Sequence, residues 1–144
     1  MISKSLQARF AAVLAAILFA GAAQAHWSLD NDASSLSFVT VKAEHVAEVH
    51  TFDSLSGTIG DDGSVEITIE LASVNTMIQI RNERMQEMLF ETALFPDATI
   101  TGSINLDALT GMDAGASVVR QIDFELSLHG QSVALAADVQ ITRT

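Results

Sequence analysis

Residues 65–71, Val-Glu-Ile-Thr-Ile-Glu-Leu, alternate apolar and polar side chains without interruption. Successive side chains of a β-strand point to opposite faces, so this period of two predicts a strand with one apolar and one acidic face. Residues 122–128 and 133–141 repeat the pattern, and less regular strands are predicted over 36–41, 55–59 and 98–106. Consecutive strands of this kind indicate an all-β antiparallel sandwich or up-and-down barrel.

Short turns connect the predicted strands. Gly60-Asp61-Asp62-Gly63 supplies glycines for a hairpin between 55–59 and 65–71. His129-Gly130-Gln131-Ser132 joins the last two strands, and residues 107–117 form a longer loop.

One segment has a residue pattern typical of a helix: residues 81–99, RNERMQEMLFETALFPDAT. Met85, Met88 and Leu89 fall on one helical face, which predicts a helix within 76–89. A shorter turn over 92–95 ends at Pro96, which cannot continue a helix. We therefore expect a short helical insertion near 76–95, where it can cover a sheet edge or cap an opening.

The N-terminus has the pattern of a secretory signal peptide. Lys4 and Arg9 precede a short apolar run over 10–20, and Ala23-Gln24-Ala25 offers a small-x-small cleavage site. We expect a signal peptide over 1–25, one domain over 26–144 and a periplasmic location. The apolar run is shorter than the ~20 residues of a membrane span, so no integral span is expected in the mature chain.

The composition of the chain disfavours nucleic-acid binding. The chain has no cysteine, 7 basic and 18 acidic residues, and a net charge of −11. Loss of residues 1–25 removes two basic residues and no acidic ones, which lowers the net charge to −13. Such a surface repels phosphate backbones, so nucleic acid is not an expected partner.

No catalytic or metal-binding constellation is visible. Serine does not occur in a G-x-S-x-G pattern, and the histidines at 26, 45, 50 and 129 have no metal-site spacing. The expectation is a non-enzymatic protein without metal or cofactor. Arg81 and Arg84 have two interpretations: an anion-binding fork at a cavity mouth, or ion pairs with Glu83, Glu87 or Glu91.

Three segments resemble the YceI-like, polyisoprenoid-binding proteins of bacterial periplasms. They are His26-Trp27-Ser28-Leu29-Asp30 followed by Ser35-Leu36-Ser37-Phe38, the sequence RNERMQEMLFETALFPDATITGSI over 81–104, and Leu126-Ser127-Leu128-His129-Gly130. The resemblance implies a lipocalin-like antiparallel barrel whose apolar lumen holds an isoprenoid lipid or a quinone-like relative. The expected lumen-lining residues are Phe38, Phe52, Ile67, Ile69, Met85, Phe90, Phe95, Ile100, Phe124 and Leu126.

Two features depart from this family. Gln131-Ser132-Val133-Ala134 replaces its usual Val-Thr-Lys-Pro-like turn, and family members usually continue with further strands after the segment 133–141. We therefore expect an incompletely closed barrel. An alternative function is an interaction module whose open sheet edge pairs with a partner chain or with a second copy as a homodimer.

Overall fold

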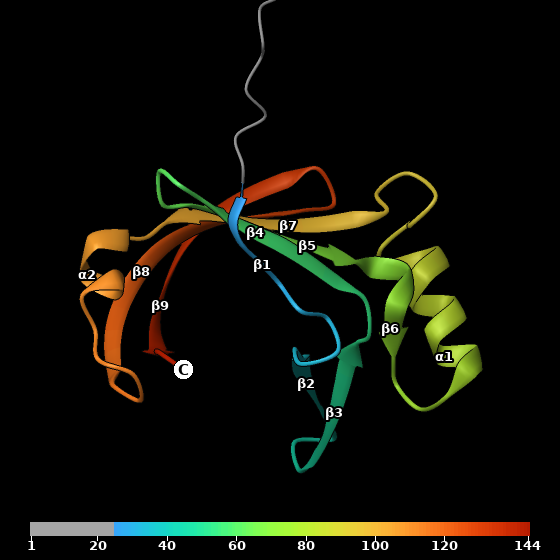
Figure 1. The fold of residues 1–144 in the computed structure, drawn as a ribbon. Helices are drawn as coiled ribbons and strands as arrows, with labels where there is room; N and C mark the ends of the chain where they lie inside the picture. The colour runs from blue at the N-terminus through green and yellow to red at the C-terminus, as the bar shows by residue number, and fades with distance from the viewer. Residues whose placement is uncertain (1–24) are drawn as a thin grey trace, which may run out of the picture.

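The computed structural model describes residues 25–144, which form two antiparallel sheets (Figure 1). The larger sheet has the order β1-β4-β5-β7-β8-β9, with strands Ala25–Ser28 (β1), Leu55–Gly60 (β4), Ser64–Glu70 (β5), Asp97–Ser103 (β7), Ser117–Leu128 (β8) and Gln131–Thr142 (β9). The smaller sheet has the order β2-β3-β6, with strands Leu36–Lys42, Val46–Phe52 and Val74–Asn75. The expected signal peptide over 1–25 lies almost wholly outside the described residues and stays a prediction.

The register separates the two faces of the larger sheet. Ile67 pairs with Ile100, which pairs with Leu126, whereas Glu66 pairs with Thr101, which pairs with Glu125. Directly opposed residues of an antiparallel ladder project to the same face. The face with Ile67, called the inner face below, is therefore apolar and the outer face is polar. This confirms the strand interpretation drawn from the alternation.

The larger sheet does not close on itself. Within residues 25–144, β1 pairs with β4 and β9 pairs with β8, which leaves the other edge of each strand unpaired. In Figure 1, β8 and β9 bend down from the plane of the central strands, and the β2–β3 hairpin projects on the same side. The expectation of an incompletely closed, lipocalin-like antiparallel barrel with a helical insertion is confirmed.

The helical insertion lies within the predicted range 76–89. A 3-10 turn, η1 (Leu71–Ser73), precedes β6, and α1 spans Gln79–Arg84 before continuing as one π-helical turn, η2 (Met85–Leu89). The Oδ1 atom of Asn82 accepts hydrogen bonds from the backbone N and Oγ1 of Thr76 at 2.8 and 2.6 Å, which fixes the chain before the helix. Glu91 adopts a φ of 50° and turns the chain away from the helical path.

A second short helix, α2 (Leu106–Thr110), occupies part of the predicted 107–117 loop. The side chain of Asn105 caps it by accepting a hydrogen bond from the backbone N of Ala108. The predicted strand over 98–106 accordingly ends at Ser103.

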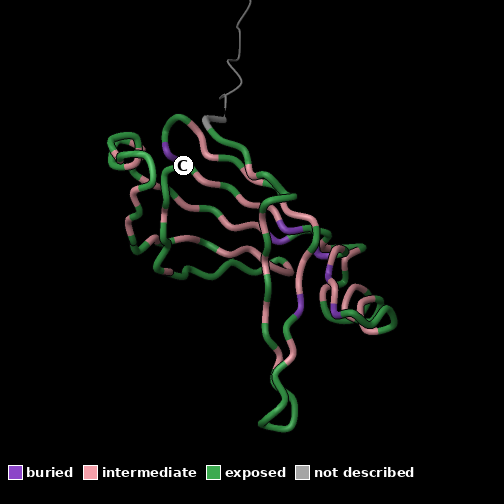
Figure 2. Tube along the Cα trace, turned by 60° about the horizontal axis from the view of Figure 1, so that its bottom comes forward, coloured by how far each residue is buried: buried purple, intermediate pink, exposed green. Residues whose placement is uncertain are grey.

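The tightly packed part of the interior is small and lies near α1. Its buried cluster consists of Ile69, Leu71 and Ala98. Phe52 and Phe90 pack against this cluster, with ring centroids 5.8 Å apart. Most buried positions in Figure 2 gather in the strands next to the helical insertion. The remainder of the inner face is therefore less densely covered by the chain.

Candidate functional site

The inner face of the larger sheet holds a groove of about 890 Å³. This volume lies within the range of small-molecule sites in proteins. Its lining comes from all six strands, from α2 and the residues on either side of it, and from the residues after β9: Trp27, Ile59, Val65, Ile67, Ile100, Gly102, Ile104, Leu109, Thr110, Met112, Ile122, Phe124, Val139, Ile141, Thr142, Arg143 and Thr144. None of these lining residues is Asp, Glu or His. The side chains that line the groove therefore offer burial to an apolar guest, and none of them is a carboxylate or an imidazole.

Strand glycine contributes to the space in the groove. Gly102 of β7 pairs with Phe124 of β8, and both line the groove. A Cβ atom at position 102 would lie 3.2 Å from the carbonyl oxygen of Asp123 and 3.4 Å from the Cβ of Phe124. The hydrogen side chain thus lets the two strands approach while the Phe124 side chain projects over the inner face.

Trp27 of β1 lies at the other side of the groove. It pairs with Ile59 of β4, and 41% of its surface is exposed. Trp27 is the one tryptophan of the chain. We therefore expect its fluorescence to change if a molecule occupies the groove.

Arg143 connects the groove to α2. Its Nη1 atom donates hydrogen bonds to the carbonyl oxygens of Thr110, at 2.9 Å, and of Met112. These carbonyls lie at the C-terminal end of α2, where a cation is favourable. The backbone N of Arg143 also donates to the carbonyl of Ala116, which extends the β8–β9 ladder past Thr142.

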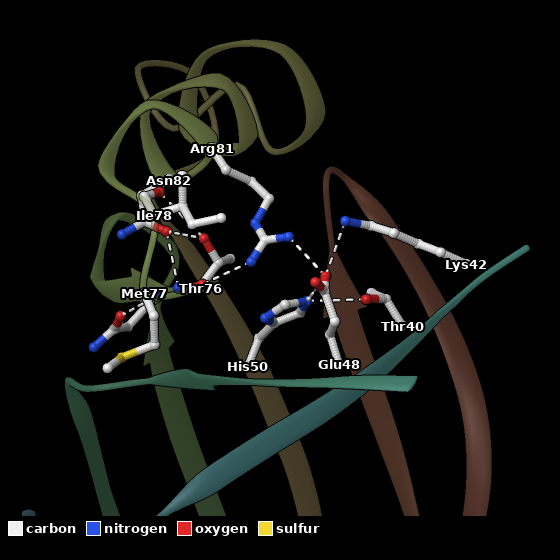
Figure 3. A network of polar contacts seen from close by, with 10 residues as sticks. Thr40, Lys42, Glu48, His50, Thr76, Met77, Ile78, Arg81 and Asn82 are labelled. Atoms are coloured by element: carbon white, nitrogen blue, oxygen red, sulfur yellow. Dashed lines mark hydrogen bonds and ion pairs between the residues drawn. The ribbon is translucent and has the colours of Figure 1, made fainter. Parts of the chain in front are cut away.

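A polar network connects α1 to the smaller sheet (Figure 3). Oε2 of Glu48, in β3, accepts a hydrogen bond from Nη1 of Arg81 at 2.7 Å. The same oxygen forms an ion pair with Nζ of Lys42 at 3.0 Å. Nη2 of Arg81 donates to the carbonyl of Thr76. Arg81 therefore pairs with a residue from a distant strand, and the interpretation that it pairs with Glu83, Glu87 or Glu91 is wrong.

The network has an electrostatic consequence for Glu48. The hydrogen bond from Lys42, followed by that from Arg81, holds the pKa of its carboxyl below the ordinary value of 4.5. His50 lies beside it, 4% exposed, with Nε2 at 2.9 Å from Oγ1 of Thr40. This cluster is close to the Phe38 ring, whose centroid lies 5.2 Å from that of His50.

Comparison with protein families identifies the chain. The model of the YceI-like domain matches residues 27–144. The chain belongs to the YceI-like family. No curated protein sequence matches it.

Solved structures agree with this membership. A polyisoprenoid-binding domain from Saccharophagus degradans, implicated in plant cell wall breakdown, is 40% identical with a TM-score of 0.81; the match covers 83% of this chain and 69% of that one. BcnA of Burkholderia cenocepacia is 21% identical, with a TM-score of 0.56 and coverage of 79% and 70%. A Campylobacter jejuni YceI protein is 23% identical, with a TM-score of 0.52 and coverage of 80% and 67%. The last two similarities show the fold alone.

Two of the segments that carry the YceI-like resemblance meet at the hairpin before β9. Phe95, from the insertion, packs against His129, with tilted rings whose centroids are 4.3 Å apart. Nε2 of His129 lies 2.6 Å from Oε2 of Glu91. These two contacts hold the hairpin turn, in which His129 has a φ of 51° and Gly130 a φ of 70°, against the insertion.

The structure distributes the predicted lumen-lining residues over two regions. Ile67, Ile100 and Phe124 line the groove. Leu126 is on the inner face by register, and Ile69 is in the buried cluster. The others lie toward the insertion. Phe52 contacts the rings of both Phe38 and Phe90, Met85 is in η2, and Phe95 packs against His129. Ligand contact by these residues stays a prediction.

Several groove residues were absent from that predicted set. Val65 and Ile122 belong to the same alternating strands as predicted residues, and Ile141 belongs to the alternating segment 133–141, so the signal for all three was present. Trp27, Leu109 and Met112 come from β1 and the α2 region, where no alternation marks the face.

Among residues 25–144, no group of three or more His, Cys, Asp or Glu side chains is placed to hold a metal ion. Nor does this part of the chain contain a helix of the length and hydropathy needed to cross a bilayer.

Proposed function

We propose that this YceI-like protein is a periplasmic, non-enzymatic carrier that holds an isoprenoid or similar long apolar lipid on the inner face of its open barrel. The observation that carries the proposal is the apolar groove to which all six strands of the larger sheet contribute. The 40% identical relative from Saccharophagus degradans, a polyisoprenoid-binding domain, supports the choice of ligand. The signal-peptide pattern of residues 1–25 supports the location.

Burial supplies the affinity in this proposal. Each CH₂ group removed from water contributes about 0.8 kcal/mol, so ten carbons contribute roughly 8 kcal/mol before the cost of association. The side chains of the groove provide shape and an apolar surface, and no bond is made or broken. Of the ten predicted lumen-lining residues, Ile67, Ile100 and Phe124 line the groove, and we expect these three to contact the lipid.

The test is native mass spectrometry of the protein exported by a bacterial host. A discrete adduct with the mass of a prenyl lipid, lost when Phe124 is replaced by Asp in a still folded protein, supports the carrier. Protein that remains free of lipid in the host, and also when mixed with geranylgeraniol, contradicts it.

A second candidate is the interaction module, favoured by the exposed side chains of β9. Val133 and Leu135 are 54% and 42% exposed on the inner face of this edge strand. An unpaired strand edge is a template for pairing with another chain. Sedimentation velocity tests self-pairing: a dimer that dissociates on Leu135→Lys substitution supports a homodimer, and a monomer over the whole accessible concentration range contradicts it.

A further inference from the structure

The helical insertion carries the most exposed large apolar side chains of residues 25–144. Met77, Met88 and Leu94 are 87%, 77% and 71% exposed, more than any other large apolar side chain there, and Ile80 and Leu89 are exposed as well. The insertion lies at the margin of the molecule (Figure 1, Figure 2). Exposed apolar side chains that gather in one place mark contacts with another protein or with a membrane.

One side of the insertion attaches it to the rest of the protein. Arg81 binds Glu48 at 2.7 Å, and Nε2 of Gln86 donates a hydrogen bond to the carbonyl oxygen of Ala72 at 2.9 Å. The Phe90 ring packs into the aromatic cluster. The exposed apolar side chains therefore belong to the other side of the insertion, which faces solvent.

This solvent-facing side combines apolar side chains with a free cation. Ile80, Arg84 and Met88 follow one another at a spacing of four positions, which makes them neighbours on a helix surface. The side chain of Arg84 makes no hydrogen bond or ion pair within residues 25–144, whereas Lys42 and Arg81 bind Glu48. We call Met77, Ile80, Arg84 and Met88 the insertion face.

Met77 is held in its exposed position by the loop before α1. It has a φ of 62°, in the left-handed region that residues other than glycine rarely adopt. Its backbone N donates a hydrogen bond to Oδ1 of Asn75 at 3.0 Å, and Thr76 is bound to Asn82 through both its backbone N and its Oγ1. An apolar side chain that is already fixed in position loses little conformational freedom when a partner covers it.

The charges select the kind of surface that fits this face. A guanidinium among apolar side chains matches the boundary of a phospholipid bilayer, where phosphates lie next to acyl chains. The chain has a net charge of −11, and Glu83 and Glu87 are also exposed on the helix, so an anionic surface would repel it. A zwitterionic phospholipid offers Arg84 a phosphate without net negative charge. Charge complementarity therefore points to a zwitterionic bilayer.

We infer that the insertion face docks on the surface of a zwitterionic phospholipid bilayer, with Met77, Ile80 and Met88 at the acyl-chain boundary and Arg84 at the phosphates. This inference rests on the proposed carrier function, because a long apolar lipid dissolves in a bilayer and not in water. It specifies the surface at which the carrier takes up and releases its lipid. The contact is interfacial, since apolar side chains of a surface helix reach only into the head-group and acyl boundary.

The test is flotation of the folded, delipidated protein with phosphatidylcholine vesicles at low and at high salt. We expect the wild-type protein to float at both salt concentrations, because burial of apolar side chains is not screened. Met77→Asp and Met88→Asp should each lower the partition coefficient about tenfold. Aspartate tolerates the left-handed backbone at position 77, so that variant should fold.

Val119→Asp is the matched control. Val119 is 59% exposed and pairs with Gln140 on the outer face of β8, so this variant makes the same change of charge away from the insertion. It should bind vesicles as the wild-type protein does. Phe124→Asp should also float, because docking requires the insertion face and not the groove.

A second measurement separates docking from the carrier function. Met77→Asp should bind geranylgeraniol as the wild-type protein does in a titration of Trp27 fluorescence, since Met77 does not line the groove. Wild-type protein that binds geranylgeraniol but does not float overturns the docking inference and leaves the carrier intact. Protein that neither floats nor binds geranylgeraniol overturns both. Flotation without geranylgeraniol binding supports docking and contradicts the carrier.

Three further results would overturn the inference. Equal losses of flotation in Met88→Asp and Val119→Asp would show an effect of net charge. Loss of flotation in Phe124→Asp would show that a vesicle lipid enters the groove in place of surface docking. A dimer in sedimentation velocity that dissociates on Met88→Asp substitution would show that a second copy covers the face.

Discussion

Nη1 of Arg81 lies 2.7 Å from Oε2 of Glu48, which joins the helical insertion to the β2–β3 hairpin across 33 positions of the chain. The same guanidinium binds the carbonyl of Thr76. One side chain thus connects α1, the segment before it and the smaller sheet. Since α1 has six residues, it depends on such tertiary contacts more than on its own helix propensity.

Replacing Arg81 by Gln should therefore destabilise the protein. Loss of the Glu48 and Thr76 contacts at a partly buried position is expected to lower the free energy of unfolding by about 1–3 kcal/mol. Urea denaturation at pH 7 measures the change. Arg84→Gln, on the exposed side of the same helix, should change it by less than about 0.5 kcal/mol. Equal effects of the two substitutions would contradict the role of Arg81.

The lowered pKa of Glu48 predicts how stability depends on pH. Because the pKa is lower in the folded than in the unfolded state, the ionised carboxylate stabilises the folded protein above the ordinary value of 4.5. This contribution is lost as the pH falls through the lower, folded pKa. The melting temperature should thus fall less steeply with acid in Glu48→Gln than in the wild-type protein. Parallel pH profiles would show that Glu48 contributes nothing.

The hairpin glycine should be sensitive to substitution for two separable reasons. A Cβ at Gly130, where φ is 70°, would lie 3.2 Å from Cε1 of Phe95. Gly115 has a φ of 83° but nothing within 4 Å of its Cβ position. Both alanine variants are expected to lose about 1 kcal/mol from backbone strain, and Gly130→Ala should lose more because Phe95 must move. Thermal unfolding of the pair measures the difference, and a larger loss in Gly115→Ala would refute this explanation.

Two carboxylate substitutions, one inside the groove and one outside it, should differ in their effect on lipid binding. Phe124→Asp places a carboxylate among the lining residues, whereas Thr101→Asp adds one on the outer face of the neighbouring strand. Because a buried unpaired charge is costly, the first should weaken geranylgeraniol binding about a hundredfold or more. Thr101→Asp should bind as the wild-type protein does. Circular dichroism establishes that both variants fold, and retained binding by folded Phe124→Asp would count against the groove.

The sequence could predict features that depend on a local pattern, and it could not predict those that depend on pairing with distant residues. The alternation around Ile67 determined the strand and its faces, because a period of two needs no knowledge of the partner strand. It could not determine depth, so residues of the packed cluster such as Phe52 were grouped with groove residues such as Phe124. The alternation predicts which face of the sheet each residue is on. The strand register then shows how far along that face the residue lies.

The sequence did not predict the short helix α2 or the long-range pairing of Arg81 with Glu48. A helix of five residues such as α2 leaves too few positions for a 3.6-residue period to be visible. The pairing of Arg81 with Glu48 depends on how the hairpin meets the insertion, whereas Glu83 and Glu87 were near it in sequence alone.

The most direct measurement of the central claim is a titration of the folded, delipidated protein with geranylgeraniol, followed by the fluorescence of Trp27. A saturable change that reaches one lipid per chain, and that disappears in Phe124→Asp but persists in Thr101→Asp, is the predicted result. Absence of a saturable change in the wild-type protein, or an identical change in both variants, would contradict a lipid held in the groove.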